Sequence, residues 1–177
     1  MIKLIIYFVC AILLFRVIKF VLAYFIIGYK KNKAYKLFLN TNRFVTNECH
    51  LIYQALPTIS NTFVEQKNEL QNLSNTISEI SKLDDSYENI DRKIALYGIM
   101  TKQFDNILIN ICDKDQYVND KNLLEIINQY NKLQSDINYK KQLYNKAADS
   151  LRHSAEVFPT SFFARLRKII PVDSYNL

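Results

Sequence analysis

The chain has very few of the residues that enzyme sites and sheet turns usually need. Its 177 residues include two glycines, three prolines, two histidines, three cysteines and no tryptophan. Glycine-rich phosphate loops and dinucleotide fingerprints need several closely spaced glycines, so the isolated Gly28 and Gly98 exclude both motifs. Sheet proteins place glycine and proline at their turns, so the composition also predicts an all-α chain.

The histidines and cysteines do not form a metal-binding pattern. His50 directly follows Cys49, and neighbours in a helix point about 100° apart, so the two do not converge on one ion. Neither His50 nor His153 has the glutamate three residues earlier that di-iron bundles use. Cys10, Cys49 and Cys112 lack zinc or redox spacing and are expected to be reduced, structural thiols. We expect no metal, no cofactor and no catalytic residue.

One long apolar run opens the chain. Residues 2–29 read IKLIIYFVCAILLFRVIKFVLAYFIIGY and carry charge only at Lys3, Arg16 and Lys19. A helix needs about 20 mostly apolar residues to cross the roughly 30 Å hydrocarbon core of a bilayer. The main interpretation is a transmembrane anchor over residues 1–29, tilted or offset so that Arg16 and Lys19 snorkel or meet a partner.

Two other interpretations of this run stay open. Residues 4–15 have the length of the apolar part of a signal peptide, although no small-x-small cleavage site follows at once. The helix could also lie in the membrane interface, although its apolar residues surround it rather than forming one stripe.

Positive charge gathers just after the apolar run and near the C-terminus, and the net charge is +6. Four lysines lie within residues 30–36, whereas Lys3 alone precedes the run, so the positive-inside rule predicts a single-pass protein with its remaining chain in the cytoplasm. The lipid bilayer is the first expected partner, and anionic lipid headgroups suit the basic charge. Protein partners and a homo-oligomer are further candidates. No nucleic acid is expected, because no recognition motif is present.

Helical periodicity continues after the apolar run. Apolar residues recur at helical spacing over residues 34–55, and no proline or glycine separates this segment from the anchor. Pro57 suits the first turn of a new helix, which predicts a break there and a second helix over residues 57–82. Asp85 and Glu88 have the spacing of a capping box at the start of a third helix.

The fourth and longest helix is expected over residues 121–157. Its apolar residues follow one another at steps of four and three, which favours near-parallel packing of the coiled-coil type. Gln134 and Lys141 occupy two positions of this seam. Tyr130 and Tyr144 lie on the same seam, where buried rings need partners for their hydroxyl groups.

These segments predict an all-α fold, with an N-terminal transmembrane helix followed by an up-and-down bundle of four long helices over residues 30–158. A polar loop over residues 112–119 precedes the fourth helix, which Asp120 can cap. Asp113 and Asp115 in this loop could bind calcium only weakly, because the glycine and terminal glutamate of an EF-hand are missing.

A basic amphipathic tail is expected over residues 159–177. A helix there would separate apolar from basic side chains: Phe162, Phe163, Leu166, Ile169 and Ile170 on one side, and Arg165, Arg167 and Lys168 on the other. The tail could pack on the bundle or dock on the membrane surface. The candidate membrane or partner contacts are Arg16, Lys19, Phe162, Phe163, Arg165, Arg167 and Lys168.

The C-terminal part carries the most specific sequence pattern. A Tyr-Asn pair, Tyr144-Asn145, lies on the long last helix, which ends in Phe158-Pro159, and an apolar segment then leads to Tyr175. With the Leu56-Pro57 pair further upstream, this arrangement resembles the LemA family, although Ser161 replaces the usual asparagine, and Arg165 and Lys168 stand where that family often has glycine. The resemblance implies a bacterial, membrane-anchored four-helix bundle without an established catalytic activity.

These patterns lead to one main functional hypothesis and one alternative. The main hypothesis is a membrane-anchored helical scaffold or interaction protein of the cell envelope. The alternative is a peripheral lipid- or partner-binding module that uses the basic C-terminal tail. An enzyme is not expected, because no constellation of acid, base and nucleophile is visible in the sequence.

Overall fold

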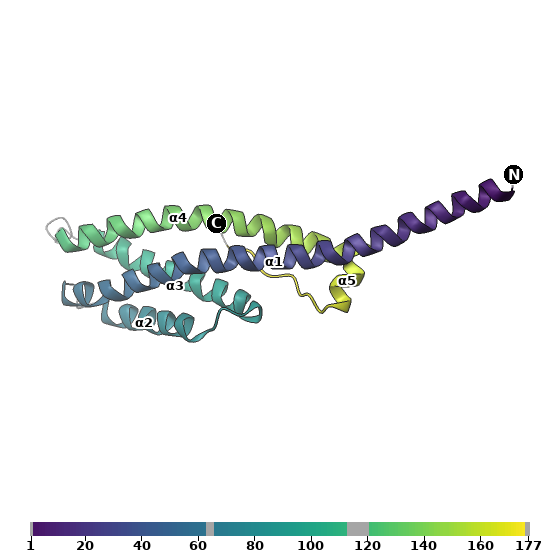
Figure 1. Cartoon of the computed structure of the whole chain (residues 1–177). Helices are drawn as coiled ribbons and strands as arrows, with labels where there is room; N and C mark the ends of the chain where they lie inside the picture. Colours follow the sequence, from purple (N-terminus) through teal and green to yellow (C-terminus); the bar gives the residue numbers. More distant parts are fainter. Residues whose placement is uncertain (1, 63–65, 113–120, 176–177) are drawn as a thin grey trace. The chain divides into compact units, whose positions relative to one another are not determined.

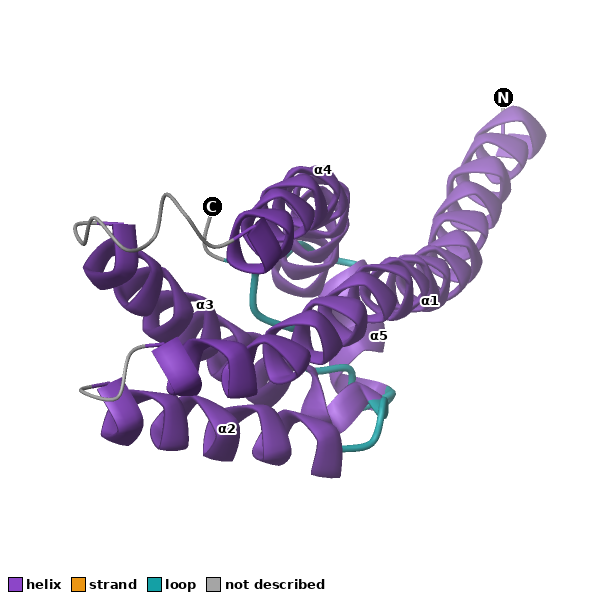
Figure 2. Cartoon of the chain, turned by 90° about the vertical axis from the view of Figure 1, so that its left-hand side faces the viewer, coloured by secondary structure: helices purple, strands orange, loops and turns teal. Residues whose placement is uncertain are grey.

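The chain is built from helices joined by short connections. The computed structural model describes residues 2–62, 66–112 and 121–175. Within these ranges there is no strand (Figures 1 and 2), which confirms the predicted all-α class. The elements are α1 (Ile2–Thr62), α2 (Lys67–Lys82), the 3-10 helix η2 (Tyr87–Asn89), α3 (Ile90–Cys112), α4 (Lys121–Glu156) and α5 (Thr160–Leu166).

Helix α1 does not break at Pro57 but continues to Thr62, so the predicted boundary at Pro57 is wrong. A proline inside a helix costs about 3 kcal/mol, because it removes one backbone hydrogen bond and crowds the preceding turn. Ile52 and Ile59 on either side of it are fully buried. Burial of each contributes about 1.5–3 kcal/mol, which offsets the local cost of the proline. The second helix therefore begins at Lys67 instead. Phe63, an apolar residue within the predicted range of the second helix, lies outside the described residues.

The turn between α2 and α3 is organised by Asp84. Its Oδ1 accepts hydrogen bonds from the Ser86 N–H at 3.0 Å and from Asn89 Nδ2 at 2.7 Å. Ser86, not Asp85, directly precedes the helical turn, so the predicted capping box is wrong. The Asp85 carboxylate forms an ion pair with Lys93 of α3.

The expected apolar stripes supply much of the core. Helix α2 packs along α3 (Figure 2). The seam of the fourth helix is confirmed over most of its length by six buried residues: Leu123, Tyr130, Ile137, Tyr144, Ala148 and Leu151. Phe158 lies beyond the end of α4 and is 67% exposed. The polar loop expected at residues 112–119 lies almost wholly outside the described residues.

The tail contains one short helix, α5, which ends at Leu166. Lys168 adopts a left-handed backbone conformation with φ 49°. The N–H of Ile169 bonds the Ala164 carbonyl at 2.9 Å, and the N–H of Lys168 bonds the Arg165 carbonyl at 3.1 Å. This is the Schellman arrangement that ends helices. It turns Ile169 into the core and leaves Ile170 exposed, so these two residues do not share a helical face.

The chain divides into two compact units, and both α1 and α4 contribute residues to each. The first unit contains Met1–Lys36 and Lys146–Val172, and the second contains Leu37–Asn145 and Asp173–Leu177. The domain limits expected at residues 29 and 158 stay predictions.

Candidate functional site

The N-terminal segment of α1 in the first unit is exposed along its whole circumference. From Lys3 to Leu22 every side chain that the structure describes is exposed, up to 77% at Leu4. Burial begins at Ala23 and continues at Ile27. Residues 2–22 make a helix of about 31 Å, close to the thickness of a bilayer's hydrocarbon core. By length and composition α1 could cross a membrane, and an N-terminal signal sequence or a core helix of a soluble protein would pass the same test.

An aromatic cluster surrounds the end of this exposed segment. The ring of Phe20 meets those of Phe158 and Phe163 edge-on, with centroids 5.5 and 5.7 Å apart. Phe162 lies 6.4 Å from Phe20, and Tyr24 lies 5.7 Å from Phe163. Such edge-to-face pairs each add about 0.5–1.5 kcal/mol beyond the apolar area that they bury. The cluster therefore joins α1 to α5 and to the turn before it.

Polar contacts strengthen the packing of α1 in this unit. The Arg167 guanidinium lies 4.9 Å from the centroid of the Tyr24 ring. A Cβ at Gly28 would come within 2.5 Å of Arg167 Nη1, so the absence of a side chain at Gly28 permits this approach. Two residues after Gly28, Lys30 Nζ donates a 2.5 Å hydrogen bond to Ser154 Oγ of α4.

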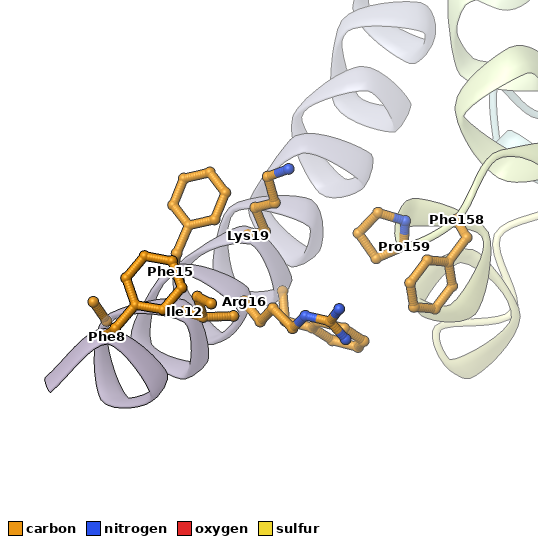
Figure 3. Close-up of a pocket in the computed structure, with 9 residues that line it drawn as sticks. Phe8, Ile12, Phe15, Arg16, Lys19, Phe158 and Pro159 are labelled. Atoms are coloured by element: carbon orange, nitrogen blue, oxygen red, sulfur yellow. The ribbon is translucent and has the colours of Figure 1, made fainter. Parts of the chain in front are cut away.

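A groove of about 760 Å³ lies beside the aromatic cluster (Figure 3). Arg16 and Lys19 of α1 line it, and Phe158 and Pro159 lie across the groove from them. Lys19 Nζ is 4.7 Å from the centroid of the Phe15 ring, which also lines the groove. The groove thus combines apolar walls with two cations.

The structure brings most of the sequence-predicted contact residues into this part of the first unit. Arg16 and Lys19 line the groove, Phe162 and Phe163 pack on Phe20, and Arg167 lies over Tyr24. The remaining two, Arg165 and Lys168, are exposed and line no part of the groove.

The second unit contains a buried polar network that the sequence analysis missed. Glu48 of α1 is fully buried. Its Oε2 accepts a 2.8 Å hydrogen bond from the Tyr97 hydroxyl of α3, and its Oε1 accepts a 2.7 Å bond from Gln134 Nε2 of α4. Gln134 is one of the two polar residues on the apolar seam, and this irregularity was the available signal of a buried polar partner.

The tyrosines of the seam have the hydroxyl partners that the sequence requires. The Tyr130 hydroxyl donates to Asp105 Oδ1 at 2.9 Å, and Gln134 Nε2 donates to the Tyr130 oxygen at 3.1 Å. The Tyr144 hydroxyl donates to the Asp173 carbonyl at 2.8 Å. The second polar residue of the seam, Lys141, places its Nζ 4.6 Å from the centroid of the Tyr97 ring. The expectation for both tyrosines is confirmed.

Burial governs the ionisation of this network. It raises the pKa of Glu48 to about 7, against the hydrogen bond from Tyr97 and the positive charge of Lys141. Burial also lowers the pKa of Lys141, although the carboxylates of Glu48 and Asp105 oppose that shift. Glu48 therefore changes its charge near neutral pH.

The last described residues, 173–175, form a C-terminal strap in the second unit. The N–H of Tyr175 donates to Asn145 Oδ1, and Asn145 Nδ2 donates to the Tyr175 carbonyl, both at 2.8 Å. The N–H of Asp173 donates to Asp91 Oδ1 at 2.8 Å. A cavity of about 690 Å³ borders the strap and the network, with Tyr97 and Lys141 in its lining. Tyr144 and Asn145, the pair that carries the LemA resemblance, both hold this strap.

The described ranges contain no group of three or more His, Cys, Asp or Glu side chains that could hold a metal ion. Asp113, Asp115 and Asp120 lie outside those ranges. Cys10 is exposed, and Cys49 is buried with its Sγ 3.4 Å from Met100 Sδ. Cys49 is therefore placed as a packing residue of the core.

Comparison with known proteins adds no identification. No protein-family model, curated protein or solved structure matches this chain. The likeness to the LemA family stays a prediction from the residues that carry it.

Proposed function

We propose that this protein is a membrane-anchored helical scaffold or interaction protein of the cell envelope, of the LemA kind and without catalytic activity. In this proposal α1 crosses the bilayer once, and the rest of the chain lies in the cytoplasm. The observation that carries it is the exposed apolar segment of α1 before Ala23.

Insertion energies favour the bilayer for this segment. Thirteen exposed Leu, Ile, Val and Phe side chains between Leu4 and Leu22 contribute roughly 4–8 kcal/mol in total. Arg16 and Lys19 would each cost about 2.5–3.5 kcal/mol at the centre of the span. They lie about 6 and 10 Å beyond the midpoint of residues 2–22, so their charged ends can reach the headgroups at a lower cost.

The other origins of such a helix fit less well. A core helix of a soluble protein would be covered, whereas only 11% of the most apolar part of α1 is buried. A cleaved signal peptide would be followed by a separate mature domain. Here the same helix runs without a break from the apolar segment into the packed residues Ala23 and Ile27. A retained anchor accounts for both features.

The proposal includes an up-and-down bundle of the four long helical segments. Its support is a set of side-chain bonds within the second unit. Asp85 accepts hydrogen bonds from Asn42 of α1 and from Lys93 of α3. Glu48 of α1, Tyr97 of α3 and Gln134 of α4 meet in the buried network.

Two observations support the LemA comparison and two do not. The Tyr144-Asn145 pair has a defined role, because both side chains hold the C-terminal strap. Lys168, which stands where the family often has glycine, adopts the left-handed conformation that glycine favours. Pro57, however, lies inside α1 rather than at a break between helices, and Arg165, the other position where the family often has glycine, lies within helix α5.

Membrane fractionation with alkaline carbonate, followed by protease treatment from one side, tests the proposal. We expect the full chain to resist extraction, and we expect protease to cleave the large helical part only when it is added from the cytoplasmic side. A variant without residues 2–22 should be released. Release of the full chain would contradict the anchor, and cleavage from the outer side would contradict the orientation.

A second candidate function is peripheral binding through the tail. It is favoured by the apolar side chains that α5 and the following residues leave exposed, namely Phe162 at 52%, Leu166 at 65% and Ile170 at 71%. The variant without residues 2–22 should then still float with anionic liposomes. Arg165→Glu with Lys168→Glu should abolish that flotation, whereas Lys121→Glu with Lys132→Glu on the exposed side of α4 should not.

A further inference from the structure

The groove beside Arg16 and Lys19 is apolar except for these two cations. Its other lining residues are Phe8, Ala11, Ile12, Phe15, Phe20, Phe158 and Pro159, so none is acidic. Glu156, the acidic residue nearest to Phe158 in the sequence, is exposed and does not line the groove. Cations in apolar surroundings need a counter-charge or water, and the lining of the groove provides no counter-charge.

The groove lies in the C-terminal half of the proposed span, where snorkelling can bring the charged ends of Arg16 and Lys19 to the headgroups. Arg16 and Lys19 are three residues apart and therefore share one side of α1. On their N-terminal side the helix exposes apolar residues such as Phe8 and Ile12, and on the other side the aromatic cluster around Phe20 begins. Aromatic and basic side chains at the end of an apolar span are typical of the membrane–water interface.

We propose that this groove binds one anionic phospholipid, with its phosphate between Arg16 and Lys19 and an acyl chain along Phe8, Ile12 and Phe15. This inference rests on the proposed membrane anchorage of α1. Arginine and lysine side chains both donate charge-assisted hydrogen bonds to phosphate oxygens. The apolar wall formed by Phe8, Ile12 and Phe15 continues into the exposed segment of α1, so the chain of the lipid stays in contact with the bilayer.

Charge complementarity selects an anionic lipid over a zwitterionic one. The ammonium group of a choline or ethanolamine headgroup would face two cations and no carboxylate in the groove lining. Each Lys or Arg near a membrane surface raises the affinity for an anionic lipid, relative to a zwitterionic one, by a factor of roughly five. Two such residues predict a preference of roughly tenfold or more.

The absence of tryptophan permits a clean measurement. Phe158→Trp places the only tryptophan of the chain in the groove, at a side chain that is already 67% exposed. The full chain with this change is reconstituted into phosphatidylcholine vesicles. One set of vesicles contains phosphatidylglycerol with brominated acyl chains, and the other contains phosphatidylcholine with brominated acyl chains. We expect the brominated phosphatidylglycerol to quench the tryptophan at a roughly tenfold lower mole fraction. Equal quenching by the two lipids would overturn the inference.

Two charge variants locate the preference. Arg16→Gln with Lys19→Gln should remove it, because the groove then holds no cation. Lys33→Gln with Lys36→Gln removes two exposed lysines of the same helix and should leave the preference intact. A preference that survives the first pair would overturn the inference.

A second tryptophan reporter and a carbonate wash distinguish failure of the lipid site from failure of the membrane anchor. Tyr139→Trp, on an exposed position of α4 in the second unit, should show no preference between the lipids. A chain that resists carbonate but shows no lipid preference at Phe158→Trp would overturn the lipid site alone. A chain that carbonate releases and that neither lipid quenches would overturn the membrane anchor and the lipid site together.

Discussion

The two units use the same two helices in chemically different ways. In the first unit α1 and α4 bury small or aliphatic side chains, including Ala23, Ile27, Ala148 and Leu151. In the second unit they bury Glu48, Lys141 and Tyr144, whose polar groups have partners on other elements. Apolar contacts are non-directional, whereas a buried hydrogen bond requires one particular register of the helices. The second unit is therefore specified by its polar network as well as by its packing.

The largest expected effect is a loss in the free energy of unfolding when a buried aromatic ring of the second unit is removed, compared with an exposed ring of the first unit. Phe104 is fully buried, and its ring centroid lies 4.8 Å from that of Tyr130. Phe104→Ala should lower the free energy of unfolding by about 3–5 kcal/mol, because it leaves a cavity. Phe158→Ala should cost about 1 kcal/mol, because mainly its edge contact with Phe20 is lost. Urea unfolding of the full chain in mild detergent, followed by circular dichroism, measures both, and equal losses would contradict the contrast.

A pH series tests the buried carboxylate. Burial raises the pKa of Glu48 from 4.5 to about 7, so folded Glu48 keeps its proton at pH values where the unfolded chain has lost it. The unfolded state then binds fewer protons, and the free energy of unfolding falls by about 3 kcal/mol as the pH rises from about 4.5 to 7. Glu48→Gln should largely remove this decrease. Glu79→Gln, which changes an exposed carboxylate of α2, should retain it.

The C-terminal strap provides a smaller test of the second unit. Asn145→Ala removes two hydrogen bonds to Tyr175, which should cost about 2 kcal/mol and release residues 173–175. Amide hydrogen exchange should show lost protection at Tyr175. Asn128→Ala, at an exposed position of the same helix, should change neither quantity. Unchanged protection in Asn145→Ala would mean that other contacts hold the strap.

The smallest expected effect is a stabilisation of the first unit. Lys168 holds a left-handed conformation that costs an L-residue about 1–2 kcal/mol and costs glycine little. Lys168→Gly should raise the free energy of unfolding by up to about 1 kcal/mol, after the greater entropy of glycine in the unfolded chain is included. Lys168→Ala keeps the strain and should give no gain. A thermal unfolding series of the three proteins decides between these results.

Residue patterns predicted the helices well where burial and periodicity agree. The seam of α4 appears in the structure as Leu123, Ile137 and Leu151, because apolar residues at helical spacing leave one helix face that must be covered. The same reasoning found the need for partners at Tyr130 and Tyr144. The local signals were less reliable. Pro57 and Asp85 predicted boundaries that tertiary packing and an ion pair with Lys93 overrode.

Some residues of the candidate sites could be recognised from the sequence, and others could not. Arg16 and Lys19 were visible in the sequence, because charge within an apolar run is rare and expensive. Glu48 was not, because nothing in the residues around it reveals that it is fully buried and bonded to Tyr97 and Gln134. Only Gln134 and Lys141, as polar residues on an apolar seam, indicated that a buried partner was needed.

By itself, the sequence determined the helical class, the apolar N-terminal run and the absence of glycine-based nucleotide motifs, since composition and periodicity act locally. Only the tertiary structure decided that burial starts at Ala23, that Lys168 ends α5 in a left-handed turn, and that Phe158 and Pro159 face Arg16 and Lys19. These features depend on contacts between residues more than a hundred positions apart or on a backbone conformation that lysine rarely adopts. Neither can be read from local spacing.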